Sequence, residues 1–138
     1  MSEVVMDAFS LFDPAARAVL EEALRVAERF GHGEVDIRHL VIAVATVDAT
    51  ALCEIDFPLS ASAVVEAASR LSPAPWVSQV FLSSGLKVSC QVATDRARTD
   101  AGRVGTVQLL IEVRSGQADE YQSAVRWLQA LIEAHGES

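Results

Sequence analysis

Two histidines, His32 and His39, are the side chains with the clearest potential for chemistry in this sequence. They lie seven residues apart, and a pair of imidazoles can bind a metal ion or act as an acid and a base. His39, however, follows a predicted helix start and can hydrogen-bond to the end of the neighbouring helix. We therefore interpret His39 as structural, and the sequence predicts neither a metal site nor a cofactor.

The other residue types that carry catalysis lack the partners that catalysis needs. Glu21, Glu22 and Glu28 belong to a predicted solvated helix face rather than to a pair of catalytic carboxylates. Ser83, in the run Ser83-Ser84-Gly85, has neither the strand–turn–helix context of a nucleophile nor a convincing Asp and His to activate it. The Walker motif, GxxxxGK followed by Ser or Thr, does not occur. We predict no catalytic residue and no enzymatic activity.

The cysteines and tryptophans are also predicted to serve packing. Cys53 and Cys90 have no CxxC spacing and no nearby histidine ladder, so we expect two buried thiols in a reduced, cytosolic setting. Trp76 and Trp127 are expected to pack in the core or against a linker rather than to form a binding platform.

Composition indicates one acidic domain with a core of small aliphatic residues. Its 138 residues suffice to bury a core without disulfides or metals, and 51% of them are hydrophobic. The net charge of −8 argues against nucleic acid or an anionic membrane as the main partner. No apolar run approaches the ~20 residues of a membrane span, and the acidic N-terminus is unlike a signal peptide. We expect a cytoplasmic protein.

Helix-start and helix-stop residues divide the first half of the chain after a short arm, residues 1–11. Asp and Ser cap predicted helix starts, whereas glycine and proline end helices. The predicted helices run from Asp13-Pro14 to Gly31, onward from Asp36, from Thr50 to Glu54, and from Ser60 to about Leu71. The Pro-rich residues 72–75 are predicted to be a linker between two halves.

The second half repeats the first at a constant shift of 69 residues, without a gap. The matches fall mainly at apolar and turn positions, where a shared fold demands similarity. They include Phe12 with Phe81, Val19 with Val88, Gly33 with Gly102, Val35 with Val104, Leu40 with Leu109, Ile42 with Ile111, and Val44 with Val113. We predict an all-α domain of two pseudo-symmetric four-helix repeats, residues 12–71 and 76–138.

The second repeat also allows a different interpretation. Leu86, Val88, Cys90 and Val92 alternate as in a strand, so residues 77–113 could form a β-meander. We favour helix because the ungapped repeat ties this region to a clearly helical first half. The last helix, from Ala118 to His135, lacks the proline break of its counterpart, which predicts either two merged helices or a milder kink.

These residues resemble the Clp repeat domain, found at the N-terminus of Clp ATPases. The resemblance covers about residues 9–135. It rests on Phe12-x-x-x-Ala16-Arg17-x-Val19, on Gly31-His32-x-x-Val35-x-Ile37-x-His39-Leu40, and on Gly105-Thr106-Val107-Gln108-Leu109-Leu110, which is similar to the family's Gly-Thr-Glu-His-Leu-Leu signature. The resemblance implies a domain that receives adaptors and protein substrates and has no catalysis of its own. The N-terminal arm and Met start favour a free-standing protein over a piece of a larger Clp ATPase.

Two ligand classes follow from the resemblance. Some members bind phosphorylated arginine through the acidic residue of the signature, but Arg38 and Val107 stand at these positions and cannot hold a guanidinium. The family also binds cyclic peptide antibiotics through two phenylalanines that match Phe9 and Phe81; Leu86 replaces a flanking basic residue. Phe9 and Phe81 could instead belong to the core.

The leading hypothesis is a non-enzymatic Clp-repeat module that binds a peptide, adaptor, protein substrate or cyclic peptide. The expected groove lies between the repeats and uses Phe9, Phe12, Phe81 and Leu86. Such a protein would regulate Clp protease targeting or act as a decoy. An interaction protein with a non-Clp partner is the alternative, and a small α+β enzyme would follow only if the second half were a sheet.

Overall fold

The computed structural model describes residues 10–71, 81–100 and 102–136, with side chains of the last helix up to Ala134. Within these residues the chain forms helices joined by short loops and two two-residue strands. The elements are α2 (Pro14–Arg29), β1 (Glu34–Val35), α3 (Ile37–Val47), α4 (Thr50–Glu54), α5 (Ala61–Ser69), β2 (Phe81–Leu82), α6 (Ser84–Thr99), α7 (Thr106–Gly116) and α8 (Ala118–Gly136). The predicted all-α class is confirmed, and the alternative of a β-meander in the second half is wrong.

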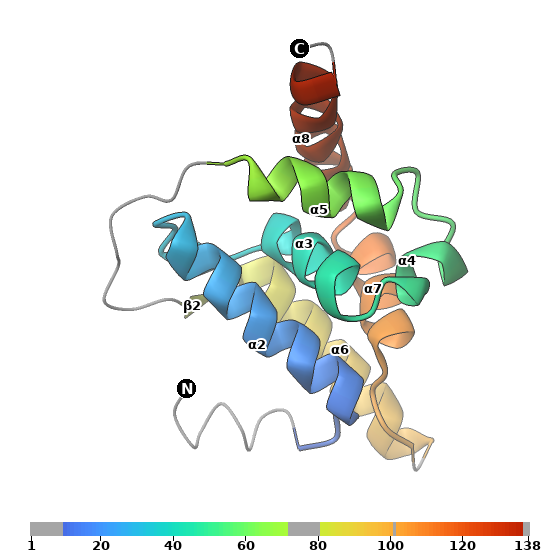
Figure 1. Ribbon diagram of the computed structural model, residues 1–138. Coiled ribbons are helices and arrows are strands. Elements are labelled where there is room, and N and C mark those ends of the chain that lie inside the picture. Colours follow the sequence, from blue (N-terminus) through green and yellow to red (C-terminus); the bar gives the residue numbers. More distant parts are fainter. Residues whose placement is uncertain (1–9, 72–80, 101, 137–138) are drawn as a thin grey trace.

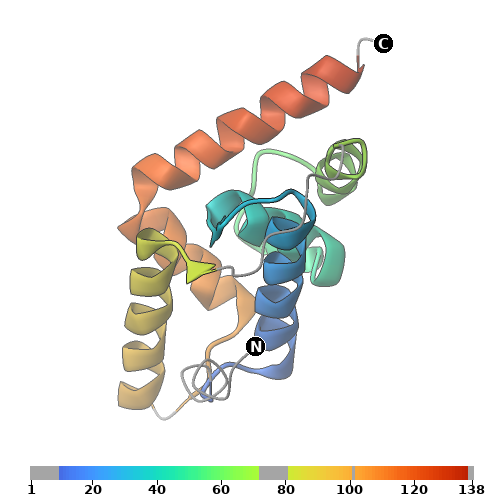
Figure 2. The same cartoon turned by 90° about the vertical axis from the view of Figure 1, so that its left-hand side faces the viewer.

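Helix α3 forms the centre of the molecule, where it packs against α2, α5 and α8. Helix α7 packs against α6 and α8 and also contacts α2 and α4 (Figure 1). In Figure 2, α8 crosses one end of the molecule, while α2 and α6 run along opposite sides below it. The core between these helices is closed by fully buried side chains from three of them, including Leu40, Leu109 and Leu128.

Short extended segments of the two repeats pair with each other at two places. β1 of the first repeat pairs in parallel with β2 of the second, with Glu34 opposite Phe81 and Val35 opposite Leu82. In the reverse sense, Phe12 of the first repeat bridges to Val104 of the second. The segment just before the first helix of each repeat therefore pairs with an extended segment of the other repeat, as pseudo-twofold symmetry requires.

The repeat is present, but its register contains a one-residue gap that the sequence comparison missed. Asp13 caps α2 and Ser83 caps α6, so the first helices of the two repeats are related by 70 residues. The buried positions agree with this shift: Ala16, Val19, Leu20, Ala23 and Ala27 correspond to Leu86, Ser89, Cys90, Ala93 and Ala97. The pairings of Phe12 with Phe81, Val19 with Val88 and Gly33 with Gly102 are therefore wrong. The extra residue of the first repeat lies in the loop after His32.

From Val35 onward the predicted shift of 69 residues holds. Helices α3 and α7 begin and end at equivalent residues under this shift, and the matched side chains are buried in both: Leu40 with Leu109, Val41 with Leu110, and Val44 with Val113. The counterpart of α4 and the described part of the counterpart of α5, residues 130–136, both fall within α8, which is continuous. Of the two predicted outcomes for this segment, the structure has the merged helix.

Part of the predicted organisation lies outside the described residues. This applies to Phe9, to the linker at 72–75 and to Trp76. The predicted boundaries of the arm and the linker therefore stay predictions.

Candidate functional site

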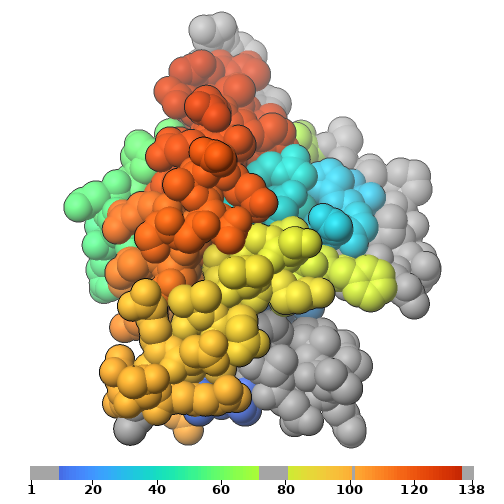
Figure 3. All heavy atoms as spheres, turned by 180° about the vertical axis from the view of Figure 1, so that it is seen from behind, coloured from blue at the N-terminus to red at the C-terminus, as the bar shows by residue number. Residues whose placement is uncertain are grey.

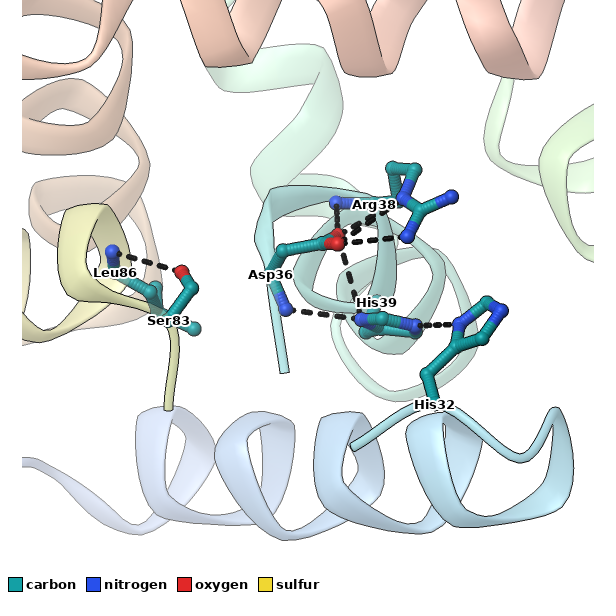
Figure 4. A network of polar contacts seen from close by, with 6 residues as sticks. All are labelled: His32, Asp36, Arg38, His39, Ser83 and Leu86. Carbon is teal, nitrogen blue, oxygen red and sulfur yellow. Dashed lines mark hydrogen bonds and ion pairs between the residues drawn. The ribbon is translucent and has the colours of Figure 1, made fainter. Parts of the chain in front are cut away.

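A compact set of polar contacts organises the start of α3 (Figure 4). Oδ1 of Asp36 accepts a hydrogen bond from the backbone N–H of Arg38 at 2.9 Å, which caps the helix. The backbone N–H of Asp36 donates in turn to Nδ1 of His39 at 2.9 Å, a reciprocal capping box. The Arg38 side chain folds back onto the same carboxylate, with Nε 3.1 Å from each oxygen and Nη2 2.8 Å from Oδ2.

The end of α2 places His32 against His39. Gly31 has φ of 70°, a conformation that glycine adopts without strain. The N–H groups of Gly31 and His32 then donate to the carbonyls of Glu28 at 3.1 Å and Ala27 at 2.9 Å, a Schellman ending. This ending brings Nδ1 of His32 within 2.7 Å of Nε2 of His39. The predicted hydrogen bond from His39 to the neighbouring helix end is confirmed.

The hydrogen bonds determine the tautomer of His39. Because its Nδ1 accepts from Asp36, the neutral ring carries its proton on Nε2 and donates that proton to His32. His39 is 1% exposed, and burial lowers the pKa of His39 to about 4. Burial acts to raise the pKa of Asp36, but the hydrogen bonds of Arg38 and the charges of His39 and Arg38 together lower it.

A pocket of about 540 Å³ opens beside this network. We call it the first pocket, and it lies where the start of α3, the start of α6 and one face of α8 meet, as seen in the cyan, yellow and orange surfaces of Figure 3. It is lined by Glu34, Asp36, Ile37, Arg38, Ser83, Asp119, Glu120, Ser123, Ala124 and Trp127. Within the lining, the Arg38 guanidinium carbon lies 5.0 Å from the centre of the Trp127 ring, a cation–π contact.

A second pocket, of about 310 Å³, is the pseudo-symmetric counterpart of the first. It is lined by Asp13, Asp48, Thr50, Ala51, Glu54, Gly105, Thr106, Val107 and Gln108. Under the repeat, Asp36, Ile37 and Arg38 correspond to Gly105, Thr106 and Val107; Ser83 corresponds to Asp13; and Asp119, Glu120 and Ser123 correspond to Thr50, Ala51 and Glu54. The fold therefore builds the same pocket twice.

Both pockets are acidic, and each can attract a cationic group. The first has four carboxylates in its lining and one arginine, Arg38, which is paired with Asp36. The second has the carboxylates of Asp13, Asp48 and Glu54, and none of the described residues in its lining is basic. The capping role of His39 is taken by Gln108, whose Oε1 accepts from the N–H of Gly105 at 3.1 Å. This confirms the structural equivalence predicted for His39 and Gln108.

The residues predicted to line a peptide groove are distributed differently. Phe12 and Leu86 are buried in the core at 1% and 0% exposure, although Phe12 forms part of the floor of a hollow beside Pro14. Phe81 is 61% exposed and stands free for contact, and Phe9 lies outside the described residues. A direct role for Phe81 stays a prediction, whereas Phe12 and Leu86 support the surface from beneath.

Several other predicted roles are now placed. Ser83 caps α6, with its Oγ accepting from the N–H of Leu86 at 3.2 Å. Glu22 pairs with Arg25 on the surface of α2, as expected of a solvated face. Cys90 is buried, and burial raises its pKa to about 12. The expectation that Cys53 is buried is wrong, because α4 turns Ala51 and Leu52 inward and leaves the thiol exposed.

Sequence reasoning missed the pocket walls. Trp127 packs against the hydrophobic core, as predicted, and it also lines the first pocket together with the carboxylates of Asp119 and Glu120. Asp48 and Glu54 of the second pocket carried no recognised motif. A search for polar residues that the repeat places at equivalent positions would have paired Glu54 with Ser123 and so pointed to both pockets.

Two features are absent from the described residues. None of their helices has the length and apolar character needed to span a membrane. They also contain no group of three or more His, Cys, Asp or Glu side chains arranged to hold a metal ion.

The fold is recognised by comparison with solved structures and not by comparison of sequences. No protein-family model matches the sequence, and no curated protein matches it. The N-terminal domain of the caseinolytic protease associated chaperone ClpD from Arabidopsis thaliana superposes with a TM-score of 0.60 at 15% identity, covering 94% of this chain and 97% of that one. The Hsp104 N-terminal domain from Candida albicans gives 0.60 at 14%, covering 92% and 93%.

A structure from a malarial protein secretion system gives the same TM-score of 0.60 at 16% identity, covering 91% of this chain and 94% of that one. The likeness in each case extends over nearly the whole of both chains. The chain therefore has the fold of the Clp and Hsp104 N-terminal domains, two helical repeats in a single unit, as its resemblance to the Clp repeat predicted.

Proposed function

We propose that this protein is a non-enzymatic binding module that receives a basic segment of a partner protein, either a substrate or an adaptor, in its acidic pockets. The observation that carries the proposal is the pair of pseudo-symmetric pockets lined by carboxylates. Side chains such as Asp48 and Glu54 offer acceptors to a lysine or arginine, and partial enclosure strengthens such ion pairs relative to open water.

The fold supports a role in protein handling, since the structures it resembles are N-terminal domains of chaperones. We propose that the protein acts in the cytoplasm, where it regulates the delivery of substrates to a Clp protease or serves as a decoy for ligands of one. A cyclic peptide antibiotic is a second class of ligand, and the 61% exposure of Phe81 offers an apolar contact for it. Alanine at Phe81 should weaken that binding and leave binding of basic peptides unchanged.

Calorimetric titration with an eight-residue peptide of alternating arginine and glycine tests the main proposal, with a glutamate-for-arginine peptide as the ligand control. The variant Asp48→Asn/Glu54→Gln removes two charges from the second pocket. We expect it to lower affinity by about tenfold or more, because hydrogen bonds to charged groups contribute about 1.5–3 kcal/mol each. Glu28→Gln, which removes a carboxylate from the exposed face of α2, is the matched control.

Salt provides an independent measure, since affinity should fall as ionic strength rises. Equal affinity of the folded protein for the basic and acidic peptides would refute the proposal. Capture of a partner unrelated to Clp proteins, through a surface away from both pockets, would favour the alternative of an interaction protein that keeps only the fold.

A further inference from the structure

His32 and His39 form part of a chain of hydrogen bonds that connects the end of α2 with the first pocket (Figure 4). Nδ1 of His32 lies 2.7 Å from Nε2 of His39, and Nδ1 of His39 accepts from the N–H of Asp36 at 2.9 Å. Oδ1 of Asp36, a residue that lines the first pocket, lies 3.3 Å from the same Nδ1. His39 is buried, whereas His32 and Asp36 are partly exposed. The chain therefore joins two groups that solvent reaches through one ring that solvent does not reach.

In the neutral protein each ring nitrogen in this chain has one role. Because Nδ1 of His39 accepts a hydrogen bond, the hydrogen of His39 is on Nε2 and is donated to His32. Nδ1 of His32 is then an acceptor, and the hydrogen of His32 is on its own Nε2. The contact of 2.7 Å between the rings requires this arrangement of hydrogens or its complete reversal.

A proton bound at His32 is incompatible with the neutral arrangement. An imidazolium ring carries a hydrogen on both nitrogens, so the Nδ1–H of His32 would oppose the Nε2–H of His39 across 2.7 Å. Exchange of the His39 tautomer removes this conflict, because Nε2 then accepts from His32 and the hydrogen of His39 is on Nδ1. Oδ1 of Asp36, 3.3 Å away, is an acceptor for that hydrogen. The N–H of Asp36 loses its acceptor in the exchange, so the change reaches the cap of α3.

We propose that His32 and His39 form a pH-sensitive relay, in which protonation of His32 exchanges the tautomer of His39 and so alters the hydrogen bonds of Asp36 in the first pocket. The pair takes up one proton from solvent. An N–H bond forms at Nδ1 of His39, the N–H bond at its Nε2 breaks, and that hydrogen forms an N–H bond at Nδ1 of His32. The positive charge is on His32, and His39 stays neutral. The relay does not depend on which partner the protein binds.

The surroundings of His39 keep the positive charge off the inner ring. Burial lowers the pKa of His39 to about 4, and the charges of Arg38 and His32 act in the same direction, whereas Asp36 acts to raise it. Helices α2, α5 and α8 pack against α3, and their described residues add no further charge that acts on His39. His39 therefore transmits a proton without keeping it.

The surroundings of His32 allow a charge on the outer ring. Its ring meets that of Phe30 at an angle of 63°, and the guanidinium of Arg29 stands over the Phe30 ring at 5.1 Å. The charged residues nearest to His32 in the sequence are Glu34 and Arg29, which have opposite signs. Because His32 is partly exposed, water can solvate its charge.

The second repeat has the same cap without the relay. Gln108 takes the place of His39, and a carboxamide neither titrates nor exchanges tautomers. Gly102 takes the place of His32 under the shift of 70 residues that relates the first helices of the repeats. Sensitivity to pH of this kind is therefore confined to the first pocket.

Nitrogen-15 NMR of the full chain, labelled at histidine, tests the relay, because a ring nitrogen that carries hydrogen resonates far from one that does not. The chain has three histidines, and His32→Gln and His135→Gln assign their signals. Between pH 8 and pH 5, where imidazoles titrate, we expect the hydrogen of His39 to move from Nε2 to Nδ1 with the same midpoint as the protonation of His32. The amide hydrogen of Asp36 should then exchange with solvent about tenfold faster, after correction for pH, because it has lost one hydrogen bond.

His32→Gln should abolish both changes, since the amide oxygen of glutamine accepts from Nε2 of His39 throughout this range. If circular dichroism shows that this variant does not fold, His32→Asn replaces it. His135→Gln removes a histidine from the last turn of α8 and is the matched control. It should show both changes as the parent does.

The spectra of His39 also show which results would overturn the inference. Hydrogen on Nε2 throughout the titration of His32 would mean that His32 leaves the contact when it is protonated. Hydrogen on both nitrogens would place the charge on the inner ring. Exchange of the tautomer in folded His32→Gln would mean that His32 does not cause it. Absence of any titration of His32 before the protein unfolds would overturn the inference as well.

Discussion

Replacing His39 by glutamine is expected to remove most of the acid sensitivity of this fold between pH 7 and pH 5. His39 is 1% exposed, and its Nδ1 is already engaged by the N–H of Asp36. Protonation would have to add a hydrogen at that nitrogen, which breaks the hydrogen bond from the N–H of Asp36 and places a charge in the core. The Asp36 carboxylate, whose Oδ1 lies 3.3 Å from Nδ1, acts to raise the pKa of His39, but burial outweighs it. The native state therefore keeps the ring neutral.

The size and sign of the effect follow from linkage. Burial lowers the pKa of His39 from 6.5 to about 4. The free energy of unfolding therefore has its full value above pH 6.5, where His39 is neutral in both states, and it decreases as the pH falls towards 4. Between these values His39 is protonated in the unfolded chain but not in the native state, and this difference lowers the free energy of unfolding. The loss is about 2 kcal/mol at pH 5 and about 3 kcal/mol at pH 4, if the unfolded group titrates normally.

Glutamine is the appropriate substitute because the second repeat already uses it. Oε1 of Gln108 accepts from the N–H of Gly105 in the same capping position, so His39→Gln keeps the cap and loses the titration. Urea unfolding followed by circular dichroism at pH 7, 6 and 5 would give the free energy of unfolding of both proteins. His32→Gln is the control, since its amide oxygen can still accept from His39 and the pH dependence should persist.

The decisive quantity is the difference between the two pH profiles, because carboxylates elsewhere contribute equally to both. The wild-type profile should fall about 2 kcal/mol more than that of His39→Gln between pH 7 and pH 5. Parallel profiles over this range would show that His39 titrates normally in the native state, and the reasoning from burial and the capping box would be refuted.

Three further predictions concern particular positions. Gly31→Ala should lower the free energy of unfolding by about 1–2 kcal/mol, because φ of 70° strains a residue with a Cβ; a change within error in urea unfolding would contradict this. Leu40→Ala should cost about 2–5 kcal/mol, because the side chain is fully buried in the central helix, as measured by the same assay. Cys53 should react with a thiol reagent at pH 8 in the native protein, whereas Cys90 should react only after unfolding; equal rates would show that the core opens readily.

The helix ends were predictable from sequence because their signals are local. Asp13 accepts from the N–H of Ala16 at 2.8 Å, and Ser60 accepts from that of Ala63 at 3.2 Å. Each cap requires only a side chain and the backbone three residues ahead. The glycine stop at Gly31 is equally local. These signals placed most helices without any knowledge of their packing.

The first helix of the second repeat, α6, shows why other parts of the fold were harder to predict from the sequence. Val88 completes an apparent strand alternation with Leu86 and Cys90, yet it is 52% exposed on α6. The buried stripe instead includes Ser89 and Thr94, at 2% and 6% exposure. Polar residues at core positions hid the helical period and allowed the repeat to be aligned one residue out of register. Burial of Thr94 is satisfied by its own helix, where its Oγ1 donates to the carbonyl of Cys90 at 2.8 Å.

The pockets were out of reach for a different reason, since each draws on segments far apart in the chain. The first combines the start of α3 with Ser83 and with residues of α8 such as Trp127. No spacing rule connects these positions. The pairing of β1 with β2 brings Ser83 to the start of α3, and the packing of α8 against α3 brings Trp127 there. The repeat itself is the one sequence feature that predicts two equivalent sites.

Each pocket has one helix-capping carboxylate, and both carboxylates come from the first repeat but from different helices. In the first, Asp36 caps α3 and faces the small cap Ser83; in the second, Asp13 caps α2 and faces Gly105. A Cβ at Gly105 would lie 3.1 Å from Oδ2 of Asp13 and 2.6 Å from the Oε1 that Gln108 uses in its cap, so an aspartate cannot be added there while those side chains stay in place.

The position of the capping acid decides which pocket can pair its carboxylate with an arginine close by in the sequence. An arginine two residues after its carboxylate, as Arg38 is after Asp36, can turn back and chelate it through adjacent backbone. In the second pocket the capping carboxylate of Asp13 belongs to the other repeat and also accepts from the N–H of Ala16. Position 107 has no such carboxylate two residues before it. The pockets thus differ because both capping acids belong to the first repeat, one at the start of α3 and one at the start of α2. Each pocket has a carboxylate, and only the first pairs it with an arginine two residues further along the chain.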